Sequence, residues 1–76
     1  MLSIPAADDK IWRNPVWRTK RLRQVRDDYG MKSQRMATLC GVASITVLQW
    51  LSKDESQIVP DYRLRLLLLE LKRATS

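Results

Sequence analysis

The sequence predicts a small all-α domain of four to five helices. Apolar residues recur at spacings of three and four in the longer segments, as they do along one face of an α-helix. The two glycines, Gly30 and Gly41, fall where these segments end rather than inside them. A chain of 76 residues is also the right size for one domain with a single core.

Residues 1–16 are expected to form an irregular N-terminal arm. The pair Asn14-Pro15 disfavours a continuous helix, although a short turn ending near Trp12 is compatible with the pattern. Trp12 and Trp17 are expected to anchor the arm on the core, because small domains usually bury their tryptophans. Stacking of these rings on nucleic-acid bases is the alternative.

The domain proper is expected over residues 17–76 and to begin with a basic helix over 17–29. Gly30 follows at the position where helices commonly end in the left-handed conformation. The apolar stripe of this helix consists of Leu22, Val25 and Tyr29.

A second helix is expected over 33–40, with Ser33 as its N-cap. Gly41 ends it, since glycine takes the left-handed conformation that lets one helix stop and the next leave at a steep angle. Ala37 is small enough for two helices to cross closely over it. The inward residues of this helix are Met36, Ala37 and Cys40.

A third helix is expected over 44–51 after a three-residue connection, with Ser44 in the capping role. Its inward side chains are expected to pack back against Met36 and Cys40. The two short helices and the glycine between them predict a helix-turn-helix. The inward residues of the third helix are Val47, Trp50 and Leu51.

The last helix is expected over 60–73, where Pro60 and Asp61 favour the first turn. Its apolar residues are too many for one face. One stripe is expected to close the core against the first and third helices, and it consists of Leu64, Leu67, Leu68 and Leu71.

The surplus apolar residues of this helix predict a two-fold dimer, because so small a chain has little protein left to cover them. A two-fold dimer also presents two recognition helices to a palindromic site. The predicted interface consists of Tyr62, Leu66 and Leu69.

Positive charge is concentrated in residues 10–35. This segment holds nine basic side chains, six of them arginine, against Asp27 and Asp28, a balance of +7; the rest of the chain contributes −1 to the total of +6. Such segregation is typical of proteins that bind a polyanion such as DNA. A solvated basic helix face is the alternative.

Residues 33–52 resemble the DNA-binding unit of the Cro and lambda-repressor type of phage regulators. That family shares a small residue at the fifth position, glycine at the ninth and apolar residues at five others. The resemblance covers residues 18–52, and the last helix more loosely, and implies a lambda-repressor-like fold. The matching residues are Ala37, Gly41, Met36, Cys40, Val42, Val47 and Trp50.

A looser similarity is to the small phage repressors of anti-CRISPR operons, in size and in the segments "GxxxQRxA" and "WLS". The chain departs from the lambda-type pattern at Lys32 and Ala43, where a capping serine or threonine is common.

The third helix has an unusual outward side, because Ile45 and Leu48 are apolar and no arginine is present. Gln49 can pair with adenine, and the two aliphatic side chains can touch thymine methyl groups. The alternative is that Ile45 and Leu48 pack against the arm or a second subunit. The predicted base contacts are Ser44, Ile45, Thr46, Leu48 and Gln49, and the predicted phosphate contacts are Arg18, Arg21, Lys32, Ser33, Arg35 and Lys53.

Catalysis is not expected. The chain has no histidine, its lone Cys40 takes an inward position, and no metal-ligand cluster or phosphate-binding glycine loop is present. The adjacent acidic pairs Asp27-Asp28 and Asp54-Glu55 diverge rather than converge on a substrate. We therefore expect no cofactor, metal or small-molecule ligand, and no membrane partner. The single cysteine and the lack of a signal peptide favour a cytoplasmic setting. The resemblance to phage regulators implies that this is the cytoplasm of a bacterial host.

These observations favour a sequence-specific DNA-binding transcriptional regulator. The expected form is a phage or mobile-element repressor that binds a palindromic operator as a homodimer. The alternative is a protein-binding inhibitor with the helix-turn-helix fold, a phage factor directed against the host or its defences. It would use Ile45, Leu48 and the basic surface against an acidic partner.

Overall fold

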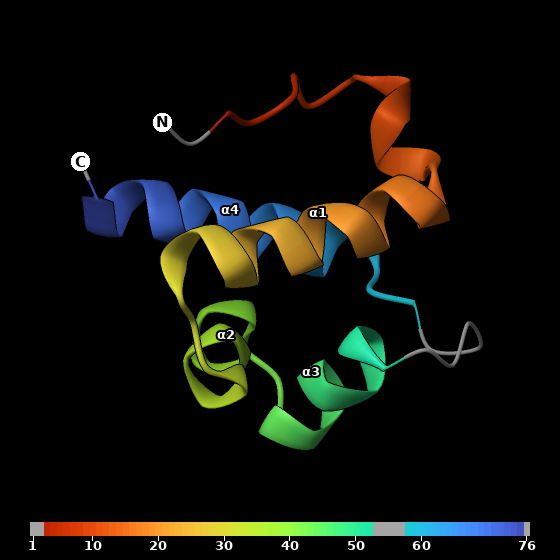
Figure 1. The fold of residues 1–76 in the computed structure, drawn as a ribbon. Coiled ribbons are helices and arrows are strands. Elements are labelled where there is room, and N and C mark those ends of the chain that lie inside the picture. The colour runs from red at the N-terminus through yellow and green to blue at the C-terminus, as the bar shows by residue number, and fades with distance from the viewer. Residues whose placement is uncertain (1–2, 53–57, 76) are drawn as a thin grey trace.

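The computed structural model describes residues 3–52 and 58–75, and over these ranges every regular element is a helix, which confirms the predicted all-α class. A short 3-10 helix, η1, precedes four α-helices (Figure 1). The bounds are Lys10–Arg13 for η1, Pro15–Tyr29 for α1, Ser33–Cys40 for α2, Ser44–Leu51 for α3 and Asp61–Thr75 for α4.

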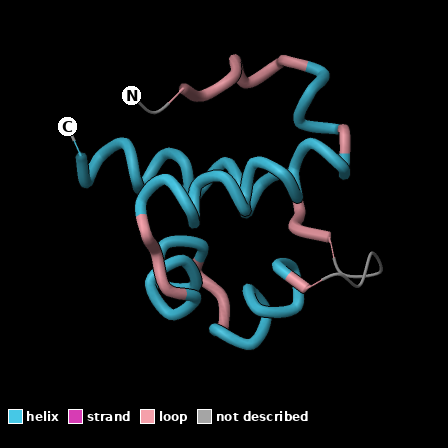
Figure 2. The backbone as a smooth tube through the Cα atoms, viewed as in Figure 1, coloured by secondary structure: helices cyan, strands magenta, loops and turns pink. Residues whose placement is uncertain are grey.

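The helices form two layers. α1 and α4 lie side by side, and α2 and α3 lie together on one side of that pair (Figure 1). The arm before α1 passes over the opposite side of the pair, as the tube in Figure 2 shows. The expectation that the last helix packs on the first helix is confirmed, and α2 rather than α3 is the main neighbour of α4; α3 packs mainly on α2 and also on α1.

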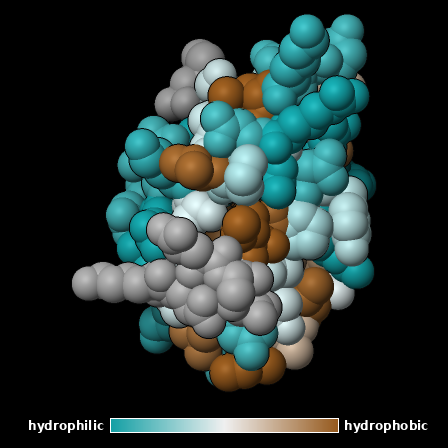
Figure 3. Space-filling model, turned by 90° about the vertical axis from the view of Figure 1, so that its right-hand side faces the viewer, coloured by the Kyte–Doolittle hydropathy of each residue, from teal (hydrophilic) through white to brown (hydrophobic). Residues whose placement is uncertain are grey.

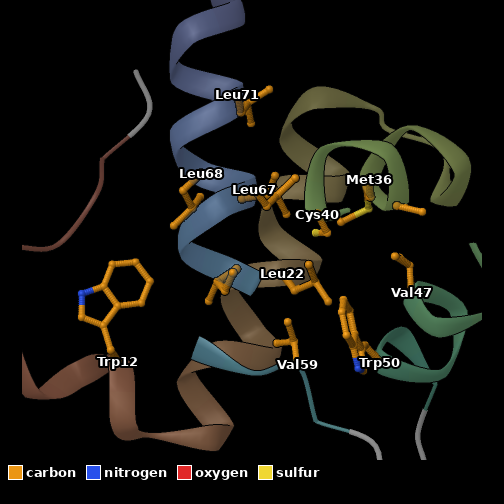
Figure 4. Packing of buried hydrophobic residues seen from close by; sticks show 13 residues of the cluster. Trp12, Leu22, Met36, Cys40, Val47, Trp50, Val59, Leu67, Leu68 and Leu71 are labelled. Atoms are coloured by element: carbon orange, nitrogen blue, oxygen red, sulfur yellow. The ribbon is translucent and has the colours of Figure 1, made fainter. Parts of the chain in front are cut away.

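The core is one hydrophobic cluster to which η1, all four α-helices and Val59 contribute (Figure 4). Every buried side chain among the described residues is hydrophobic. The predicted leucine stripe of α4 is buried, as are the predicted inward residues of α2. The cluster consists of Trp12, Leu22, Val25, Met36, Ala37, Cys40, Val47, Trp50, Val59, Leu64, Leu67, Leu68 and Leu71.

The first helix starts earlier than predicted. Asn14 and Pro15, interpreted above as a break, instead begin α1: the Asn14 side chain accepts hydrogen bonds from the backbone N–H groups of Val16 at 3.0 Å and Trp17 at 3.1 Å. Proline suits the first helical position because an N–H group there has no partner inside the helix. The irregular segment is therefore shorter than the expected arm of residues 1–16.

Tyr29 does not belong to the core stripe of α1. Its side chain is 39% exposed, whereas Leu22 and Val25 are buried. Tyr29 is the last residue of the helix, next to the turn at Gly30.

Neither predicted serine cap is present. The N-cap residues of α2 and α3 are Lys32 and Ala43, and no side-chain hydrogen bond caps either helix. Ser33 and Ser44 are instead the first residues inside their helices. The predicted bounds of both helices, 33–40 and 44–51, are confirmed.

Gly41 produces the turn between α2 and α3. It adopts the left-handed conformation, with φ of 72°, and the Val42 N–H donates to the Ala37 carbonyl at 3.0 Å. Gly30 ends α1 in the same way, with φ of 57°. Both glycines therefore act as predicted, as left-handed C-caps.

Arg63 of α4 binds the turn at Gly41. Its Nη1 donates to the Cys40 carbonyl at 3.0 Å and to the Gly41 carbonyl at 3.4 Å. The last carbonyls of a helix have no donor within that helix, and a cation near them is also favoured by the helix dipole. A Cβ atom on Gly41 would lie 3.2 Å from this same Nη1 atom.

The two glycines form a matched pair for mutation. Gly30→Ala should lower the unfolding free energy by about 1–2 kcal/mol, the cost of holding an alanine in the left-handed conformation. No steric cost is added, because nothing lies within 4 Å of the new Cβ atom. Gly41→Ala should cost about 1 kcal/mol more, since it also disturbs the hydrogen bonds of Arg63. Urea unfolding measures both. The additional cost of Gly41→Ala over Gly30→Ala should vanish when Arg63 is also replaced by methionine. Equal costs for the two glycines in the unmodified chain would show that Arg63 does not restrict the Gly41 turn.

Candidate nucleic-acid interface

The outward side of α3 carries three exposed residues. Ile45 is 60% exposed and Leu48 51%, and Gln49 is also exposed. On the opposite side, Val47 and Trp50 are buried and hold the helix on the core. The helix therefore presents two aliphatic groups and one amide outward. The space-filling view shows hydrophobic atoms at the end of the molecule formed by α2 and α3 (Figure 3).

The other two predicted base contacts, Ser44 and Thr46, are half-buried at the edges of this outward side. The arm does not cover Ile45 and Leu48, because it lies on the far side of the α1–α4 layer (Figure 1). That excludes the arm as their packing partner. A second subunit, another protein and DNA are the remaining candidate occupants of this surface.

Three predicted phosphate contacts gather at the start of α2. Lys32 and Arg35 are exposed there, and Ser33 is half-buried. The amino end of a helix carries partial positive charge, which adds to that of the two cations. Lys53, the last predicted phosphate contact, lies outside the described residues.

Arg18 has a different role from the one predicted. Its Nε donates to the Val59 carbonyl at 2.8 Å, and its Nη1 donates to the Trp12 carbonyl at 2.7 Å. The guanidinium thus joins α1 to the end of η1 and to the segment that precedes α4. Because its guanidinium is engaged in these internal hydrogen bonds, Arg18 is not a candidate phosphate contact.

Arg21 also faces the arm. Its Nη2 donates to the Ser3 carbonyl and its Nη1 to the Gln24 side chain, both at 2.6 Å. The structure therefore does not bring Arg18 and Arg21 together with the cations of α2. Their sequence positions in the basic helix did not distinguish them from cations that face solvent.

Arg23 is a basic residue that the sequence did not single out. It is half-buried on α1, and its Nη2 donates to the carbonyl of Ser52 at 3.2 Å. Ser52 is the C-cap of α3, so Arg23 places a cation at the carboxyl end of that helix. The one sequence signal for Arg23 was its position in the basic segment 10–35, which does not predict contact with the end of α3.

The tryptophans act as anchors of the arm. Trp12 is buried, its Nε1 donates to the Ala6 carbonyl at 2.8 Å, and its ring meets that of Trp17 edge-on at 5.3 Å. The guanidinium carbon of Arg65 lies over the Trp12 ring, 4.8 Å from its centre. The buried Trp12 ring cannot stack on a base, which excludes that alternative for this residue.

Cys40 is buried, at the inward position predicted for it. Burial raises the pKa of its thiol from 9.0 to about 11, and the nearby positive charge of Arg63 opposes that rise. The thiol is therefore protonated at neutral pH and a poor nucleophile. Among the residues that the structure describes, no group of three or more His, Cys, Asp or Glu side chains is placed to hold a metal ion. None of the described helices combines the length and hydrophobicity needed to cross a membrane.

The outer side of α4 is the second exposed apolar surface. Tyr62 is 61% exposed and Leu69 52%. Leu66 is half-buried, and its Cδ2 lies 4.0 Å from the position of a Cβ on Gly41, so it leans toward the α2–α3 turn. Of the three residues predicted for a dimer interface, Tyr62 and Leu69 thus have the most surface to bury.

Comparison with protein-family models, with characterised proteins and with solved structures finds no match to this chain.

The internal bonds of Arg18 can be tested by stability. Arg18→Met should lower the unfolding free energy by at least about 1.5–3 kcal/mol, the usual worth of a hydrogen bond to a charged group. Lys20→Met removes the same charge from the exposed side of the same helix and should change stability by less than about 0.5 kcal/mol. Urea unfolding at two salt concentrations measures both. Equal effects of the two substitutions would show that Arg18 is only a surface charge.

Proposed function

We propose that this protein is a sequence-specific DNA-binding transcriptional regulator, a repressor of a phage or mobile element. In this proposal α3 enters the major groove, and its outward side contacts base edges. Arg35, Lys32 and Ser33, at the start of α2, contact the DNA backbone. The protein acts in the cytoplasm of a bacterial host.

The observation that carries the proposal is that α3 packs on the core through one side only. Val47 and Trp50 bury one side of the helix, so Ile45, Leu48 and Gln49 are held outward on a rigid element. An α-helix of this kind fits the major groove, where bases can be read from their edges. The exposed cations Lys32 and Arg35 at the start of α2, in a chain of net charge +6, supply the attraction to phosphate that such binding needs.

A homodimer is part of the proposal. The exposed Tyr62 and Leu69 of α4 provide an apolar surface that a second copy of the chain would cover. Two copies related by a two-fold axis would present two α3 helices to a palindromic operator, with half-sites about 34 Å apart.

The second candidate is a protein-binding inhibitor that uses the same fold. It is favoured by one observation: two of the three exposed residues of α3, Ile45 and Leu48, are aliphatic, and none of the three is basic. An acidic protein partner with an apolar patch would complement such a surface. Selection of DNA sites distinguishes the two functions.

DNA binding predicts a steep dependence on salt. The logarithm of affinity should fall against the logarithm of salt concentration with a slope of about −0.9 per phosphate neutralised. Arg35→Ala should weaken binding to every duplex about equally and make the slope shallower by about 0.9. Gln49→Ala should instead cost about 1–3 kcal/mol on the selected operator only. Fluorescence anisotropy over a salt series measures both variants.

Lys10→Ala is the matched control, because Lys10 is exposed on η1, on the arm side of the molecule. It removes the same charge as Arg35→Ala and should leave the salt slope nearly unchanged. Equal slopes for Lys10→Ala and Arg35→Ala, or equally weak binding to all duplexes, would contradict the proposed interface.

The dimer predicts a concentration-dependent mass. An apolar side chain gains about 1.5–3 kcal/mol on complete burial, and a half-exposed one gains roughly half of that. Because each interface contains two copies of Leu69, Leu69→Glu should weaken the dimer by more than about tenfold. Val16→Glu changes a comparably exposed residue of α1 and should have no effect. Sedimentation equilibrium measures both, and a wild-type monomer at tens of micromolar would rule the dimer out.

A further inference from the structure

The outward side of α3 has a chemistry that selects among base pairs. None of the eight residues of this helix is charged, and its exposed side chains are those of Ile45, Leu48 and Gln49. It therefore offers two aliphatic surfaces and one amide, with no cation and no carboxylate.

The major-groove edges of the four bases differ in what they require. Guanine presents two acceptors and is read best by arginine or lysine, whereas cytosine presents a donor and is read by a carboxylate. α3 has neither kind of side chain. Thymine presents a methyl group that aliphatic side chains contact, and adenine presents the donor and acceptor that a glutamine amide binds together. The helix thus matches A·T pairs and lacks the groups that read G·C pairs.

The spacing of the three residues fits neighbouring base pairs. Residues three and four apart lie next to one another on a helix surface, so Ile45 is adjacent to both Leu48 and Gln49. From Ile45 to Gln49 the helix rises about 6 Å, at 1.5 Å per residue. Base pairs are stacked about 3.4 Å apart, so this length spans about two steps.

DNA fits both properties of the α2–α3 side of the molecule at once. Lys32 and Arg35 are exposed cations at the start of α2, which favour a negative partner, whereas the exposed side of α3 carries two aliphatic groups and an amide. In the major groove, thymine methyl groups lie between two rows of phosphates. The same groove therefore provides apolar contacts for α3 and negative charge for Lys32 and Arg35.

We propose that α3 recognises a short run of A·T base pairs, with thymine C5-methyl groups against Ile45 and Leu48 and an adenine against Gln49. This inference rests on the proposed DNA-binding function and assigns the bases that the same surface selects.

The test begins with selection of sites from random duplexes by the full chain. Each thymine of the enriched site is then replaced by deoxyuridine, which removes the methyl group and keeps base pairing. Affinity should fall about fourfold at each contacted position, the effect of one buried methyl-sized group. Replacement of the contacted adenine by 7-deazaadenine, which lacks the N7 acceptor, should also weaken binding.

Variants assign each effect to a side chain. Ile45→Ala and Leu48→Ala should each abolish the sensitivity to deoxyuridine at one position, and Gln49→Ala should abolish the sensitivity to 7-deazaadenine. These residues are exposed, so the variants should unfold at the same urea concentration as the unmodified chain. Val16→Ala changes an aliphatic residue that is 61% exposed on α1, and it should retain every sensitivity.

The outcomes separate the inference from the function on which it rests. An enriched site in which deoxyuridine has no effect at any position overturns the thymine contacts and leaves DNA binding intact. An enriched site of G·C pairs also overturns the inference alone. If selection enriches no site, the proposed function fails and the inference fails with it.

Discussion

At Gly41 the backbone turns through the left-handed region, and Arg63 of α4 donates hydrogen bonds to the carbonyls on either side of this turn. Ala37, one turn earlier in α2, is buried and leaves room for α3 to cross close by. This local geometry sets the direction in which α3 leaves α2. Because that direction is set, Val47 falls inside the core and the opposite side of α3 faces outward. Both the completeness of the core and the candidate interface depend on one turn.

The arm contributes buried surface to the domain through the tryptophan that the sequence predicts as its anchor. Trp12 belongs to the core cluster (Figure 4), and Arg18 donates to the carbonyls of Trp12 and Val59. A domain of this size buries a smaller share of its surface than a larger one and has no disulfide to compensate. The arm supplies additional buried surface on the side of the α1–α4 layer away from α2 and α3, and so leaves α3 uncovered.

The basic segment serves two purposes that its charge alone does not distinguish. Arg18 and Arg21 donate to backbone carbonyls near the arm, where they join parts of the chain. Lys32 and Arg35 are exposed at the start of α2, where charge is available to a partner. Arginine suits both purposes, since its planar group donates several hydrogen bonds and always carries charge. A count of basic residues therefore overstates the number that can meet a polyanion.

The sequence by itself determined the helical class, the bounds of α2 and α3, the left-handed glycines and the buried stripe of α4. These features are local, because they follow from apolar spacing and from residues that end helices. It also indicated which residues of α3 face outward, since burial of Val47 and Trp50 leaves the other side exposed. Only the tertiary structure decided that Arg18 bonds to a carbonyl 41 residues away, that Arg63 binds the turn, and that α2 is the main neighbour of α4. Those contacts form between segments that are distant in the sequence, and they depend on which carbonyls and which helix faces come together when the chain packs. The spacing of residues within one segment carries no information about such pairings.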